Sequence, residues 1–166
     1  MKVEFPGVMT PFAQVAVGDC FLYFSEEETK PDVGMKVRIE NDVELPSFST
    51  PVHPSMTAPT VFYAKPFVNS QVCVLHEAKI RPSNDPQRIG KGHLSINSPG
   101  PIIFASRVAY IRAWWKAGTV DVNLSDGSTV IPQSHVDPIW VEDWAIWLPT
   151  GTGEELLCNR GSPRAR

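Results

Sequence analysis

The chain of 166 residues lacks long apolar runs and paired cysteines. No apolar run approaches the roughly 18 residues of a membrane-spanning helix. Residues 1–10 include Lys2, Glu4 and Pro6 in place of the continuous apolar region of a signal peptide. We therefore expect a cytoplasmic protein that does not enter a membrane. The few cysteines lie far apart in apolar runs without a CxxC motif, which predicts buried, reduced thiols at Cys20, Cys73 and Cys158.

Motifs of nucleophilic catalysis and nucleotide binding are also missing. No GxSxG sequence is present, and the glycines near Lys91 lack the spacing of a Walker loop. The sequence identifies no cofactor and no reaction, and a non-catalytic protein is the preferred interpretation.

Proline is abundant, with sixteen residues that interrupt short β-branched and aromatic runs. Each proline removes a backbone donor, so long helices are not expected. The pattern predicts a mainly β fold: a single-domain antiparallel β-barrel or sandwich with at most one or two short helices. We assign residues 1–158 to this domain and 159–166 to a disordered tail.

The strand pattern alternates with two long loops. Apolar runs and period-two alternation predict strands over 18–25, 35–40, 60–64, 72–80 and 102–105. The proline-rich segments 41–59 and 81–101 read as loops, with a short strand at 93–97 in the second. Residues 36–42 and 79–85 share a pattern that suggests a duplicated β module, although two strands ending in polar turns explain it more simply.

The last third carries two predicted hairpins. Asp126-Gly127 joins strands over 119–124 and 128–132, and a second hairpin joins 144–148 to 155–158. A strand is preferred to a helix over 139–148. The segment 107–117 instead predicts a helix capped by Ser106, with Val108, Ile111 and Trp115 on one stripe. Its rival is a strand with one face formed by Tyr110, Arg112 and Trp114.

The histidines do not have the spacing of a metal site. His135 with Asp137, Glu142 and Asp143 forms the only local cluster of nitrogen and oxygen ligands, and an Asp-Pro turn explains it equally well. No metal is therefore assigned. The alternative function is an enzyme with a histidine and carboxylate site, with or without a metal. Such a site would require distant histidines to converge, namely His76, His93 and His135.

Positive charge concentrates in the middle of the chain. Residues 51–118 carry a net charge of +6, whereas the flanking segments carry −5 and −4. The most basic stretch predicts a weak anion or nucleic-acid site, formed by Lys79, Arg81, Arg88, Lys91 and His93. A pI of about 5.8 argues against nucleic acid as the partner.

Five tryptophans lie in the last third of the chain, and three of them suggest an aromatic ligand surface or a subunit interface: Trp140, Trp144 and Trp147. On a strand, Trp144 and Trp147 point to opposite faces, so one of them needs cover from another element or another subunit. This favours a homodimer. The preferred function is a non-catalytic binding or structural module that presents loops 41–59 and 81–101 to a ligand.

Overall fold

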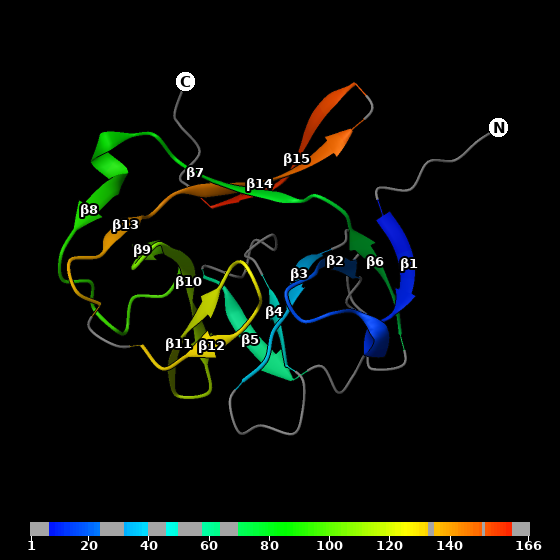
Figure 1. Cartoon of the computed structure of the whole chain (residues 1–166), viewed down its shortest axis with the longest axis horizontal. Coiled ribbons are helices and arrows are strands. Elements are labelled where there is room, and N and C mark those ends of the chain that lie inside the picture. Colours follow the sequence, from blue (N-terminus) through cyan, green and yellow to red (C-terminus); the bar gives the residue numbers. More distant parts are fainter. Residues whose placement is uncertain are drawn as a thin grey trace.

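The structure, a computed structural model, describes residues 7–23, 32–39, 46–49, 58–63, 70–132, 135–150 and 152–160. Within these ranges the chain forms β-strands and two short 3-10 helices, η1 (Phe12–Gln14) and η3 (Pro86–Arg88). The prediction of a mainly β, antiparallel fold is confirmed (Figure 1).

The larger sheet has twelve strands. All of its strand pairs are antiparallel except for one parallel contact between β5 and β10. The main path runs through β1 (Gly7–Pro11), β6 (Gln71–Leu75), β2 (Cys20–Tyr23), β3 (Asp32–Lys36), β4 (Pro46–Ser49), β5 (Thr60–Tyr63), β10 (Val108–Trp115), β9 (Ile102–Ala105), β13 (Ile139–Val141) and β8 (Ile89–Lys91). On the other side of β10, β11 (Gly118–Asn123) pairs with β12 (Thr129–Val130).

A smaller sheet of three strands contains β15 (Gly153–Arg160), β14 (Trp144–Thr150) and β7 (Lys79–Pro82), in that order. Strands β7 and β14 run along one side of the larger sheet (Figure 1). The main core joins the sheets: Trp144, Ile146 and Leu148 of β14 pack in the same cluster as Val33 and Ile111 of the larger sheet. Burial of such side chains contributes roughly 1.5–3 kcal/mol each.

A second cluster lies between η1 and strands β2 and β6, where Phe12 packs edge-on against Phe21. Beside it, Lys36 points away from the main core and donates to the carbonyls of Phe12, Ala13 and Val15, at 3.1, 3.2 and 2.7 Å. Burial lowers the pKa of the Lys36 amine, and the charge of Asp19 opposes this shift. Lys36 thereby satisfies the carbonyls of the η1 turn.

The β11–β12 hairpin is fastened to the end of β3. Its turn reaches between Gly18 and Lys36, and the backbone N–H of Arg38 donates to the carbonyl of Gly127 at 3.0 Å. Gly127 has a φ of +68°, and a Cβ atom there would lie 2.6 Å from both the Gly18 nitrogen and the Lys36 oxygen. The Asp126-Gly127 hairpin was therefore predicted correctly, and the turn requires glycine for two separate reasons.

The helix predicted over 107–117 is wrong. Residues 108–115 form β10, which pairs with β9 through a two-residue turn at Ser106 and Arg107. Both turn residues have positive φ, +50° and +68°, as a type I′ hairpin turn requires. Ser106 is thus a turn residue and not a helix cap. The rival strand interpretation is the correct one.

The strand predicted over 72–80 is two strands. A turn at His76 and Glu77, with a φ of +62° at Glu77, ends β6, and the chain enters the smaller sheet as β7. The duplicated-module pattern gains no support from this arrangement, because Lys36 is buried and Lys79 is exposed. Residues 40–42 of that pattern lie outside the described residues.

Both long predicted loops contain a strand. Strand β4 lies within 41–59, and β8 lies within 81–101, where a strand had been expected at 93–97 instead. The β2–β3 pair and the hairpin of β14 with β15 agree with the predictions, as do the strands over 139–148. Strand β3 begins earlier than the predicted 35–40. Strand β15 includes residues 159–160 of the predicted tail, and residues 161–166 lie outside the described residues.

Candidate functional site

The candidate site lies on the face of β10 that points away from the main core. Ile111 and Ala113 belong to the core cluster. Because side chains alternate along a strand, Tyr110, Arg112 and Trp114 share the opposite face. This is the face that the strand interpretation of the sequence grouped together.

Arg112 and Asp121 form a buried ion pair across β10 and β11. They are directly opposite in the strand register, with side-chain exposures of 2% and 0%. Arg112 Nε donates to Asp121 Oδ1 at 2.7 Å, and Nη2 donates to Oδ2 at 2.9 Å. This bidentate geometry compensates the charges of both buried side chains.

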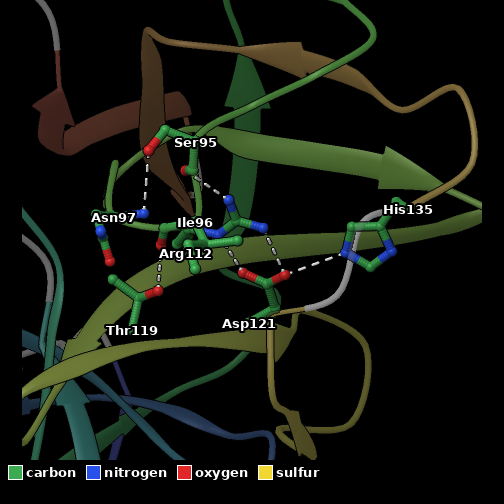
Figure 2. A network of polar contacts seen from close by, with 7 residues as sticks. All are labelled: Ser95, Ile96, Asn97, Arg112, Thr119, Asp121 and His135. Atoms are coloured by element: carbon green, nitrogen blue, oxygen red, sulfur yellow. Dashed lines mark hydrogen bonds and ion pairs between the residues drawn. The ribbon is translucent and has the colours of Figure 1, made fainter.

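The segment around Ser95 covers the ion pair (Figure 2). Arg112 Nη1 donates to the Ser95 carbonyl at 2.9 Å. The hydroxyl of Thr119, on β11, donates to the carbonyl of Ile96. Within the segment, the backbone N–H of Asn97 donates to Ser95 Oγ at 3.3 Å. Two neighbouring strands thus fix the backbone of this loop.

His135 reaches the same carboxylate from the connection between β12 and β13. Its Nε2 lies 3.1 Å from Asp121 Oδ2 (Figure 2). Its ring stacks on Tyr110 with centroids 5.3 Å apart. Because a carboxylate only accepts hydrogen bonds, Nε2 is the donor in this contact. The Nδ1 atom is then left to interact with a ligand or with water.

These elements enclose a cavity of about 90 Å³, which we call the His93–His135 cavity. The described residues of its lining include no carboxylate; they are His93, Leu94, Ile96, Ile103, Arg112, His135 and Pro138. Of the five N–H groups of Arg112, three are used in the bonds above. The lining therefore combines apolar walls with imidazole and guanidinium groups.

The predicted anion-binding residues are not gathered at one place. Lys79 and Arg81 both contact Glu154, at 3.4 and 2.5 Å, in the smaller sheet. Hydrogen bonding from Arg81 holds the pKa of Glu154 below its usual value. Arg88 lies 3.3 Å from both Glu142 and Asp143. Lys91 is exposed on β8, and His93 alone of the five lines the His93–His135 cavity.

The three tryptophans of the predicted aromatic surface occupy separate environments. Trp144 is buried and donates through Nε1 to the Gly100 carbonyl at 2.8 Å. Trp147 is covered by Arg81, whose guanidinium lies 5.7 Å from the ring centroid. Trp140 lies against Gly90, and its buried Nε1 has no partner among the described residues. Arg81 of the same chain thus covers Trp147, so this tryptophan does not require a second subunit. The homodimer stays a prediction.

The histidines converge only in part. His93 and His135 line one cavity, whereas His76 is exposed at the β6–β7 turn and His53 lies outside the described residues. In the predicted metal cluster, His135 bonds to Asp121, while Glu142 and Asp143 contact Arg88. Across the described part of the chain, no three His, Cys, Asp or Glu residues are grouped as a metal site.

The central ion pair of the site was missed in the sequence. Arg112 was named only as one member of an alternative strand face, and Asp121 was not singled out. The signal that could have revealed the pair was the alternation of side chains expected for a strand over 110–114, followed by the predicted hairpin strand that contains Asp121. Nothing local indicated that residue 95 or residue 135 would reach this pair.

Comparison with models of known families, with curated protein sequences and with solved structures finds no significant match for this chain. Among the described residues, no helix has the length and hydropathy needed to cross a membrane.

Proposed function

We propose that this protein is a non-catalytic β-rich binding domain that holds a small carboxylate group in the His93–His135 cavity. The observation that carries the proposal is the make-up of the lining. Two imidazoles, from segments 42 positions apart, meet the buried Arg112 in one cavity, and none of the described lining residues is a carboxylate. The proposal also gives part of loop 81–101 the binding role expected from the sequence.

The charge balance at the cavity favours an acceptor group in the ligand. Both Asp121 oxygens are occupied by Arg112 and His135, so the carboxylate is turned away from the ligand. The remaining Arg112 N–H groups and an N–H group of the His93 ring can donate. A volume of about 90 Å³ is the share of roughly three water molecules at ~30 Å³ each, which suits a carboxylate of one or two carbons.

Thermal unfolding in the presence of acetate, compared with acetamide, tests the proposal. The two probes have nearly the same shape, but only acetate is charged. At about ten times its dissociation constant, acetate is expected to raise the melting temperature by roughly 3–6 °C, and acetamide by much less. Equal effects of the two probes would contradict recognition of a carboxylate.

Histidine variants locate the effect. His93→Gln and His135→Gln are expected to weaken the response to acetate, whereas His76→Gln, at the exposed turn, should leave it unchanged. A response that survives in the His93→Gln, His135→Gln double variant would place the anion elsewhere.

A second candidate function is acid–base catalysis in the same cavity. It is favoured by the hydrogen bond from His135 to the buried Asp121, an arrangement that orients an imidazole and leaves Nδ1 to move a proton. Hydrolysis of p-nitrophenyl acetate is the assay. A catalytic His135 predicts a loss of about 10²-fold or more in His135→Asn but not in His76→Asn. Equal rates in both variants would exclude it.

We further propose a cytoplasmic location and self-association as a homodimer. The proposal of a reducing compartment rests on the sequence, whose three cysteines lie far apart without a CxxC motif. Recovery of a tagged protein in the soluble cell fraction tests the location, and recovery with membranes or medium would contradict it. Light scattering over a range of concentrations tests the dimer, which a constant monomer mass would contradict.

A further inference from the structure

A second cavity, of about 220 Å³, lies between the two sheets and apart from the His93–His135 cavity. We call it the inter-sheet cavity. On one side, Leu75, Cys20 and Met35 are cross-strand neighbours on β6, β2 and β3. On the other side, Ile80 and Ile146 are paired on β7 and β14. Two rows of apolar side chains thus face one space.

The turn at 76–78 joins the two sheets beside the cavity. The chain leaves β6 in the larger sheet and enters β7 in the smaller one. Glu77 and Ala78 of the turn line the cavity. Glu77 has a left-handed conformation in this turn, with a φ of +62°.

The mouth of the inter-sheet cavity is acidic. Asp19 and Glu77 both line it and both are exposed. Neither forms an ion pair with another described residue, although Asp19 interacts electrostatically with the buried Lys36. Among the described residues that line the cavity there is no lysine, arginine or histidine. A ligand with a positive end and an apolar body would match both parts of this surface.

We infer that the inter-sheet cavity binds small alkylammonium compounds, with the alkyl chain between the sheets and the ammonium group beside Glu77 and Asp19. The volume equals the share of roughly seven water molecules at ~30 Å³ each. A linear amine with about six carbons fills such a space. Glu77 supplies the larger share of the attraction, because the charge of Asp19 is partly offset by Lys36.

Titration of methyl-labelled protein with n-hexylammonium chloride tests this inference. The methyl signals of Met35, Leu75 and Ile146 are expected to shift together and to saturate, with a dissociation constant of about 1 mM. Hexan-1-ol has the same chain without the charge, and hexanoate has the opposite charge. Both are expected to bind at least fivefold more weakly. Equal binding of hexan-1-ol would show that the carboxylates of Glu77 and Asp19 do not contribute to binding, and it would contradict the inference.

Charge variants at the mouth provide the second arm. Glu77→Gln is expected to weaken binding of n-hexylammonium about fivefold and to leave hexan-1-ol unchanged. Glu155→Gln is the matched control, because Glu155 is exposed on β15, outside the cavity lining, and the change in net charge is identical. Equal effects of the two substitutions would overturn the inference, because nonspecific attraction would then explain the binding.

Cys20 gives an independent readout of occupancy. Its side chain lines the inter-sheet cavity and is half-buried, whereas Cys73 is buried and burial raises the pKa of its thiol. Saturating n-hexylammonium should slow alkylation of Cys20 by N-ethylmaleimide, measured by mass spectrometry of the Cys20 peptide. The Cys73 peptide should stay unmodified throughout, as the control for folding. Unchanged alkylation of Cys20 under saturating amine would contradict binding in this cavity.

Discussion

Substitution of Asp121 by asparagine is the most informative test of how the site is built. The carboxylate receives two hydrogen bonds from Arg112 and one from His135, and it is fully buried. An asparagine side chain keeps the shape but has one acceptor oxygen and no charge. The Asp121→Asn variant therefore leaves the Arg112 guanidinium buried without its counter-ion.

The expected cost follows from the burial of both partners. Removing one member of a buried ion pair costs about 3–5 kcal/mol, a large part of the roughly 5–15 kcal/mol that stabilises a domain. With a urea m-value near 2 kcal/mol/M, the unfolding midpoint should fall by about 1.5–2.5 M. His135→Asn, which removes one hydrogen bond and leaves the ion pair intact, should cost only about 1 kcal/mol.

Urea unfolding followed by near-ultraviolet circular dichroism measures both variants under the same conditions. We expect Asp121→Asn to lower the midpoint several times more than His135→Asn. If the two variants unfold at the same urea concentration, the Arg112–Asp121 pair does not stabilise this face of the sheet.

Two further predictions concern the β11–β12 turn. Gly127→Ala should destabilise the protein by about 2–5 kcal/mol, because the new Cβ atom would sit at a positive φ and overlap the backbone atoms of Gly18 and Lys36. Gly118→Ala is the control, because the space around Gly118 is open. Equal urea midpoints for the two variants would contradict this. Hydrogen bonds from Ser128 hold the pKa of Asp126 below its ordinary 3.8, so the carboxylate stabilises the fold above that pH. The wild type should lose this advantage over Asp126→Asn as the pH falls through the lowered pKa of Asp126; an advantage independent of pH would refute it.

How far the sequence predicts the fold depends on whether the deciding signal is local. The hairpin at Asp126 and Gly127 was predicted correctly, because glycine at a left-handed position is a strong local signal. The helix over 107–117 was wrong because Ser106 and Arg107 form a tight turn with positive φ, which neither residue favours intrinsically. Pairing of β10 with β9 and β11 outweighs the cap and the helical spacing.

The candidate site was predictable only in part. The strand interpretation of 108–115 places Arg112 on the face opposite the core, and the following hairpin strand brings Asp121 beside it. The contacts with Ser95 and His135 depend on where two connecting segments cross the sheet. That placement is fixed by long-range packing, to which the local sequence gives no access.

NMR of the histidine ring signals during a titration with acetate shows whether the His93–His135 cavity holds a carboxylate. We expect the ring signals of His93 and His135 to shift together, saturate at one acetate concentration and return when acetate is removed, while those of His76 stay in place. Acetamide should leave all of them unchanged. If His93 and His135 do not respond, or respond no more than His76, the His93–His135 cavity is not a carboxylate site.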